Sequence, residues 1–177
     1  MDQTKRRLQE AYALAKKGDY EEALRLCHEV VRDHPEQPEP LRTQADIYGH
    51  MGDYARESEV LGRVIAMGSM EPCDYYALGQ AELLAGGLDN AVQALTKAID
   101  LGNEHKNFYY SSVSHFLRAE AFVRMNKYRE ALADCEQLKE DFRYYLPSGM
   151  KTREEIVRQA KAELAKASVK KKWSFRN

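Results

Sequence analysis

Side chains that commonly perform catalysis or bind metals occur in this chain, but their spacing matches no catalytic or metal-binding motif. The five histidines stand at positions 28, 34, 50, 105 and 115. Neither an HExxH motif nor a Cys/His spacing suited to zinc connects them. The sequence also lacks a P-loop, a GxGxxG fingerprint and a GxSxG elbow. We therefore expect no enzyme activity, no metal site and no cofactor.

Acidic pairs and cysteines also have structural interpretations. Glu21-Glu22 and Glu154-Glu155 fall near expected helix starts, where negative charge favours the helix dipole. The three cysteines cannot all pair with one another and none belongs to a CxxC motif. We interpret them as reduced thiols of a cytoplasmic protein, with Cys27 and Cys135 acting as small buried hydrophobic residues.

Length and composition indicate one ordinary globular domain that spans residues 1–177. Charged residues make up 31% of the chain and hydrophobic residues 44%, and the formal net charge is −1. No overall field therefore favours nucleic acid or an acidic membrane. The N-terminus has no apolar h-region, and no apolar stretch approaches membrane-spanning length. We expect neither nucleic acid nor a membrane among the partners.

A short phrase recurs along the chain and determines how the elements must be arranged. The second and third copies each follow the previous one after 34 residues, and the fourth follows after 40. The copies are GDYEEA (18–23), GDYARE (52–57), GGLDNA (86–91) and NKYREA (126–131). Such a fixed period indicates a repeat architecture in which six residues are inserted before the last copy.

Each copy lies between two amphipathic patterns. On both sides of the first copy, apolar residues recur at spacings of three and four, which is typical of one face of a helix. Gly18 suits the end of the first helix, Asp19 can cap the second, and Pro35 cannot continue it. The repeat unit is therefore predicted to be a helical hairpin.

Small residues predict that these hairpins stack closely. Seven residues before each turn stand Ala11, Ala45, Gly79 and Ala119. The matching slot on the second helix holds Ala23, Glu57, Ala91 and Ala131, so Glu57 alone breaks the rule. A single hairpin cannot bury its apolar stripe, so successive copies must cover one another.

The period and these slots resemble the tetratricopeptide repeat family over about residues 4–145. The resemblance implies an all-α, right-handed α-solenoid of four helical hairpins. We expect the repeats at about residues 4–37, 38–71, 72–105 and 112–145. Arg7, Glu82 and His115 depart from the usual large or aromatic residues, which leaves repeats three and four the less regular pair.

Three segments lie outside the regular repeats. The insertion at residues 101–111 either lengthens a loop or starts the seventh helix early, and its aromatic residues 108–110 either pack or form an exposed contact surface. Residues 143–150 are expected to form a loop, followed by a capping helix at about 152–169 that starts with a Thr152–Glu155 capping box. In the basic tail 170–177, Trp173 either folds back onto the cap or contacts bases, a membrane or a neighbouring groove.

The family resemblance further implies that the first helix of each repeat lines a groove for a peptide or another protein. Its mixture of aromatic and charged side chains suits an interface. The expected groove residues are Lys5, Tyr12, Lys16, Arg42, Asp46, His50, Tyr76, Gln80, Phe116, Glu120 and Arg124. Leu8, Leu83 and Val123 belong either to this groove or to the seam between helices.

Within the family, one kind of groove binds the acidic C-terminus of heat-shock chaperones through Lys, Asn and Arg. Here the corresponding positions include Leu8, Tyr12, Thr43, Tyr76 and Gln80, which cannot form such a carboxylate clamp. A non-catalytic module that binds another protein is the main hypothesis. Its narrower form, by resemblance, is a bacterial chaperone or immunity protein that sequesters an effector or toxin. The alternatives are a self-associating scaffold, for example a homodimer, and an accessory subunit of an enzyme complex.

Overall fold

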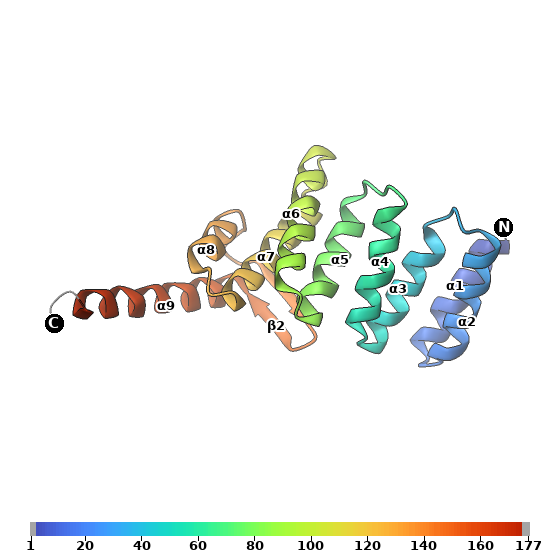
Figure 1. Ribbon diagram of the computed structural model, residues 1–177, viewed down its shortest axis with the longest axis horizontal. Helices are drawn as coiled ribbons and strands as arrows, with labels where there is room; N and C mark the ends of the chain where they lie inside the picture. Colours follow the sequence, from blue (N-terminus) through green and yellow to red (C-terminus); the bar gives the residue numbers. More distant parts are fainter. Residues whose placement is uncertain (1–2, 175–177) are drawn as a thin grey trace.

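The computed structural model describes the backbone of residues 3–174 and the side chains of residues 3–168. Within this range the chain forms nine helices and one two-stranded sheet. Figure 1 shows the helices stacked side by side in chain order, with α1 and α2 at one end and α9 leading away at the other. None of the described helices is both long enough and apolar enough to cross a membrane.

The first eight helices form four hairpins, which confirms the expected all-α solenoid. Each helix packs against the next one along the chain. The hairpins comprise α1 (Gln3–Lys16) and α2 (Tyr20–Asp33), α3 (Glu39–Met51) and α4 (Tyr54–Ala66), α5 (Pro72–Ala85) and α6 (Leu88–Glu104), and α7 (Phe108–Arg124) and α8 (Tyr128–Glu136).

The recurring phrase is the bend of each hairpin. Gly18, Gly52 and Gly86 adopt positive φ angles of 85°, 75° and 92°, and Asn126 occupies the fourth bend with φ 59°. This left-handed conformation is readily available to glycine and tolerated by asparagine. Asp53 caps α4 by accepting a hydrogen bond from the Arg56 N–H. The same role predicted for Asp19 is wrong, because its side chain makes no capping hydrogen bond to α2.

Small residues bring the two helices of each repeat together, as the sequence predicts. Ala11, Ala45 and Ala119 are at most 1% exposed. At Gly79 the contact is closer still, since a Cβ atom there would lie 2.5 Å from Cγ of Leu95. The position has no space for a side chain.

The six inserted residues lengthen two helices rather than a loop. α6 and α7 have 17 residues each, whereas the five helices before them have 13 or 14. Gly102 allows the added turns to pack, because a Cβ atom there would lie 2.6 Å from Oγ of Ser111. At the start of α7, Phe108 and Tyr109 are more than 60% exposed, while the ring of Tyr110 contacts Tyr76. Part of the aromatic cluster is therefore packed and part is exposed.

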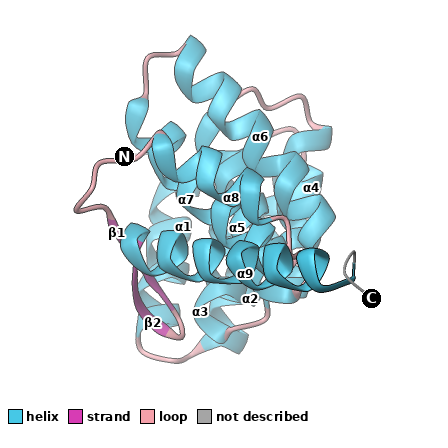
Figure 2. Ribbon diagram, turned by 90° about the vertical axis from the view of Figure 1, so that its left-hand side faces the viewer, coloured by secondary structure: helices cyan, strands magenta, loops and turns pink. Residues whose placement is uncertain are grey.

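A β-hairpin replaces the loop that was expected at residues 143–150. Strand β1 (Arg143–Leu146) pairs antiparallel with β2 (Gly149–Thr152), so that Tyr144 lies opposite Lys151 and Tyr145 opposite Met150. Seen along the stack, the two strands lie together at one side of the helices (Figure 2). Leu146 is only 1% exposed and belongs to the apolar core of the third and fourth repeats. The hairpin is therefore part of the packed structure.

Helix α9 (Arg153–Ser174) begins with the predicted capping box. The Thr152 N–H donates to the Glu155 carboxylate at 2.7 Å, and the Glu155 N–H donates to Thr152 Oγ1 at 3.2 Å. Along the apolar stripe of this helix, Ile156 and Ala160 are fully buried, Leu164 is half-buried and Ala167 is exposed. Among the described side chains of the helix, burial is thus greatest in its first half. The side chains of the basic tail at 170–177 lie outside the described residues.

Candidate functional site

The first helix of each repeat contributes to one face of the solenoid, which we call the inner face. It is formed by α1, α3, α5 and α7, where α1 contacts α3 and α5 contacts α7. All eleven residues that the sequence assigned to a groove belong to these four helices. The structure separates them into two groups, according to whether the β-hairpin covers them.

Over α5, the β-hairpin is held by the hydroxyl group of Tyr144. This hydroxyl forms a hydrogen bond with the hydroxyl of Tyr76 and accepts a second one, of 2.9 Å, from Nε2 of Gln80. Burial raises the pKa of the Tyr76 phenol above its ordinary value, with a further contribution from Tyr144. Both inner-face residues of α5 are therefore engaged with the protein's own chain.

Over α7, the inner-face residues are engaged in the same way. Phe116 is fully buried, and its ring packs against the rings of Phe142 and Tyr144. Glu120 is 4% exposed and accepts from Nζ of Lys151 at 2.5 Å and from Nε of Arg124 at 3.1 Å. Phe116 and Glu120 are thus buried by the hairpin, which corrects the expectation that they stand open in a groove.

Arg42 also has an internal partner. Its guanidinium donates two hydrogen bonds, of 2.8 and 2.7 Å, to the carboxylate of Asp74. Asp74 is 3% exposed, and a bidentate pair of this kind is specific and strong. The pair connects α3 to α5, so Arg42 holds two repeats together.

The remaining predicted residues stay at the surface of α1 and α3. Lys5, Tyr12, Lys16, Asp46 and His50 are all exposed. The ring of Tyr12 contacts the ring of His50 edge-on at 5.7 Å, and Nζ of Lys16 lies 4.7 Å from the centre of the Tyr12 ring. The first half of the inner face thus presents aromatic and charged groups to the surroundings.

A groove of about 580 Å³ lies where the open half meets the hairpin. Its walls combine acidic, aromatic and apolar side chains from three helices and the hairpin turn. The lining residues are Asp46, Gly49, His50, Tyr54, Glu57, Gln80, Leu84, Tyr145 and Pro147. This groove joins predicted inner-face residues to the β-hairpin.

Two carboxylates face this groove. Asp46 is exposed at its surface, but the surrounding walls limit its hydration and raise its pKa. Burial, together with the charge of Asp46, raises the pKa of Glu57 to about 7. In the described part of the chain, neither carboxylate group has a hydrogen-bond or ion-pair partner. Removing one negative charge, or adding a positive one, would therefore be favourable here.

Sequence reasoning missed Glu57 as a groove residue, although its signal was visible. It is the acid that replaces alanine in the small-residue slot of the second repeat. Gly49 makes room for it, because a Cβ atom at position 49 would lie 3.1 Å from both carboxylate oxygens of Glu57. The residues Tyr54, Leu84, Tyr145 and Pro147 were missed as well, since only the folded hairpin brings them together.

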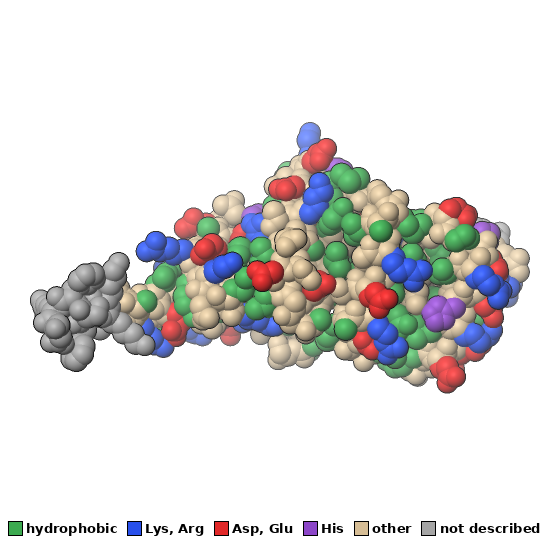
Figure 3. All heavy atoms as spheres, in the orientation of Figure 1, with side chains coloured by type: hydrophobic (Ala, Val, Ile, Leu, Met, Phe, Trp, Pro, Cys, Tyr) green, Lys and Arg blue, Asp and Glu red, His purple; other side chains and the backbone are tan. Residues whose placement is uncertain are grey.

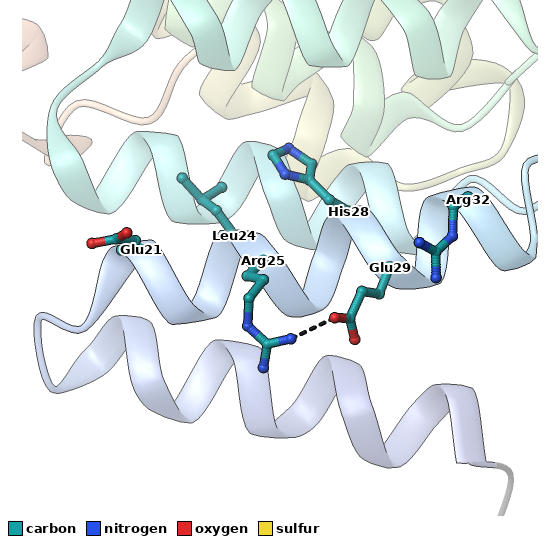
Figure 4. Close-up of a pocket in the computed structure, with 6 residues that line it drawn as sticks. All are labelled: Glu21, Leu24, Arg25, His28, Glu29 and Arg32. Atoms are coloured by element: carbon teal, nitrogen blue, oxygen red, sulfur yellow. Dashed lines mark hydrogen bonds and ion pairs between the residues drawn. The ribbon is translucent and has the colours of Figure 1, made fainter.

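Another hollow, of about 480 Å³, lies along α2 and is less suited to recognition (Figure 4). It is lined by a single helix, and its Arg25 already pairs with Glu22 and Glu29 through i,i+3 and i,i+4 contacts. Such exposed pairs contribute little and are open to water. On the face formed largely by α2, α4 and α6, acidic and basic side chains are interspersed (Figure 3).

Outside the groove, the cysteine, histidine and arginine side chains described next have structural roles. Burial raises the pKa of Cys27 to about 12 and that of Cys135 to about 11, which disfavours the reactive thiolate. His115 and Arg118 both contact the carboxylate of Asp134, which is 4% exposed. This polar cluster fixes α7 against α8.

Comparisons with known proteins agree with this architecture. The tetratricopeptide repeat family model matches residues 7–36. No curated protein sequence matches the chain.

Solved structures match much more of the chain. A structure of MamA protein is 21% identical, with a TM-score of 0.67, over 76% of this chain and 70% of that one. TPR-like repeats of a Podosopora anserina kinesin light chain are 21% identical, with a TM-score of 0.65, over 77% and 74%. A thermophilic TPR protein of Thermus thermophilus, TTC0263, is 19% identical, with a TM-score of 0.57, over 76% and 72%. At this identity the likeness concerns the fold.

Proposed function

We propose that this chain, which matches the tetratricopeptide repeat model at residues 7–36 and shares the fold of solved TPR structures, is a non-catalytic module that binds a segment of another protein over its first two repeats. One observation carries the proposal. The inner face is open over α1 and α3, whereas the hairpin occupies it over α5 and α7. A partner therefore has access to one half of the face and to the groove at its end.

The composition of the open half supports this role. It combines the aromatic ring of Tyr12 with charged groups of both signs, as interfaces commonly do. The groove adds the exposed ring of Tyr145 and two unpartnered carboxylates. Such groups orient a bound partner, because the partner supplies each of them with a neighbour that it lacks in the free protein.

A narrower form of the proposal is a bacterial protein of the cytoplasm that sequesters a secreted effector or a toxin. Free thiols at Cys27, Cys73 and Cys135 support a reducing compartment. Identification of the captured protein decides this point. A secreted effector or a toxin would support the narrower form, and a resident enzyme subunit would favour the accessory role.

The general proposal is tested by capture of proteins from a cell lysate with the full chain and two charge-reversal variants. Asp46→Lys changes the open half, whereas Glu59→Lys makes the same change at an exposed position of α4 outside the groove. We expect the captured protein to be retained by Glu59→Lys and weakened at least about tenfold by Asp46→Lys. Equal capture by both variants would exclude the open half as the binding surface.

Self-association is a second candidate, and the course of α9 favours it. Among the described side chains of this helix the last buried one is Ala160, and Figure 1 shows the helix leading away from the stack. A second copy could pack on the uncovered half-helix. Light scattering of the full chain and of a chain without residues 170–177 tests this idea. A dimer that dissociates on truncation supports it, and a monomer at high concentration rejects it.

A further inference from the structure

The β-hairpin has a free edge whose position follows from its hydrogen-bond register. In an antiparallel pair of strands, opposite residues alternate between two arrangements. In one, the two residues exchange backbone hydrogen bonds; in the other, their N–H and C=O groups point away from the partner strand. The Arg153 N–H donates to the Phe142 carbonyl oxygen at 2.9 Å. The hydrogen-bonded pairs are therefore Tyr144 with Lys151 and Leu146 with Gly149. The backbone groups of Arg143 and Tyr145 consequently point away from β2.

A second contact supports this register. The Thr152 N–H, which faces outward on β2 in the same scheme, donates to the Glu155 carboxylate instead of to β1. Beyond the strand pairing itself, no hydrogen bond of the described residues involves the backbone N–H or C=O of Arg143 or Tyr145. An exposed strand edge of this kind is a template for a further strand.

The free edge of β1 borders the groove. Tyr144 on β1 contacts Tyr76 and Gln80 of α5 and also packs on Phe116 of α7. Lys151 on β2 contacts Glu120 of α7. The neighbouring residues Tyr145 and Pro147 line the same groove as Asp46 and Glu57. Going along the inner face, the order is therefore α3, the groove, β1, β2 and α9.

The geometry points to an extended peptide segment of a partner protein as the occupant of this groove, paired as a third strand along β1 and carrying a lysine or arginine that lies between Asp46 and Glu57. Main-chain hydrogen bonds to Arg143 and Tyr145 supply binding that is independent of sequence. Because side chains of a strand alternate between its two faces, every second residue of the segment turns into the groove. The unpartnered carboxylates select the cation. This inference rests on the proposed function and specifies its partner.

The first part of the test selects ligands from a library of random decapeptides, each linked to its own messenger RNA, with the full chain as bait. We expect enriched sequences with β-branched or aromatic residues and a lysine or arginine in a two-residue alternation. Apolar residues spaced by three and four, which indicate a helical ligand, would overturn the inference. If nothing is enriched, the inference fails, and the lysate capture described above decides the proposed function separately.

The second part uses proline at two positions that face each other in the hairpin. Tyr145→Pro removes the outward N–H of β1, and Met150→Pro removes the outward N–H of β2. Both residues are more than half exposed and neither N–H belongs to the ladder, so the two changes should affect folding similarly. We expect the selected peptide to bind at least about tenfold more weakly to Tyr145→Pro than to Met150→Pro.

Further variants separate the backbone, ring and charge contributions. Tyr145→Ala keeps the N–H group and should bind more tightly than Tyr145→Pro. The wild-type protein should bind the selected peptide at least about tenfold more tightly than a copy with glutamine in place of the cation. Asp46→Asn combined with Glu57→Gln should abolish this preference. If the two proline variants bind equally while Asp46→Lys abolishes binding, the third-strand inference is wrong and the proposed function stands.

Discussion

Over α1 and α3 the inner face carries Tyr12, Asp46 and His50 at the surface, whereas over α5 and α7 the same face lies beneath the β-hairpin. The four hairpins have the same architecture, so this difference does not come from the repeats themselves. It comes from ten residues that follow the last repeat and fold back. The comparison shows that equivalent repeat positions are exposed in one half of the solenoid and covered in the other.

Covering half of the inner face has an energetic and a geometric effect. Tyr144 and Leu146 extend the core, and Lys151 supplies a cation to Glu120, the carboxylate that the β-hairpin itself buries. The hairpin also gives the open half an end wall. The exposed part of the inner face is thereby shortened and has a defined boundary.

The largest expected effect is on the covered half and comes from Tyr144→Ala. This change removes a ring packed on Phe116 and the hydroxyl group shared by Tyr76 and Gln80. We expect a loss of about 3 kcal/mol in the free energy of unfolding, measured with denaturant on the full chain. Tyr145→Ala, at a neighbouring residue that is 68% exposed, should change it by no more than about 0.5 kcal/mol. Similar values for both variants would mean that the hairpin is not packed as described.

A second expectation compares helix packing in the two halves through one substitution. Gly79→Ala in α5 places a Cβ atom 2.5 Å from Cγ of Leu95 and should cost about 1–3 kcal/mol of stability. Gly62→Ala in α4 meets nothing within 4 Å and should stabilise the protein by about 0.5–1 kcal/mol. Thermal or denaturant unfolding measures both. The contrast disappears if Gly79→Ala is also stabilising.

The smallest expected effect belongs to the open half and depends on pH. The pKa of Glu57 is raised to about 7 in the folded protein, so the folded state binds a proton that the unfolded state releases near pH 4.3. Stability is therefore highest below this lower value and falls as pH rises through about 7. Asp46, whose pKa is also raised, acts in the same direction.

The measurement is the unfolding free energy at pH 5 and at pH 8. Allowing for water in the groove, we expect the wild-type protein to lose about 1–2 kcal/mol more than Glu57→Gln over this interval. Glu59→Gln removes one charge from an exposed position of the same helix and should retain the wild-type loss. A Glu57→Gln variant with the full wild-type loss would show that the groove does not perturb this carboxyl group.

The sequence was sufficient to predict the solenoid because its signals are local and repeated. Gly18, Gly52 and Gly86 mark bends that need a left-handed backbone, and the four small residues mark the close helix contacts. The early start of α7 could be predicted only as one of two alternatives, and the lengthening of α6 was not predicted. An insertion of six residues has no periodic signal that assigns it to a loop or to helix ends.

The hairpin could not be predicted with the same arguments. Its strands have four residues each, and Arg143–Leu146 reads as a short polar and aromatic stretch before a proline. A two-stranded hairpin alone is marginal in water, so its stability comes from α5 and α7, which are distant in sequence. For the same reason the inner-face assignments of Tyr76, Gln80, Phe116 and Glu120 gave their helix face but not their internal partners.

The β-hairpin is synthesised long after the helix α5 that it covers. Tyr144 is separated from its partners Gln80 and Tyr76 by 64 and 68 residues. A ribosome makes the chain from its N-terminus, so α5 and α7 are complete before Tyr144 is joined to the chain. Until then the growing protein displays a longer aromatic surface than the finished one. Formation of the β-hairpin therefore covers aromatic surface that the incomplete chain exposes.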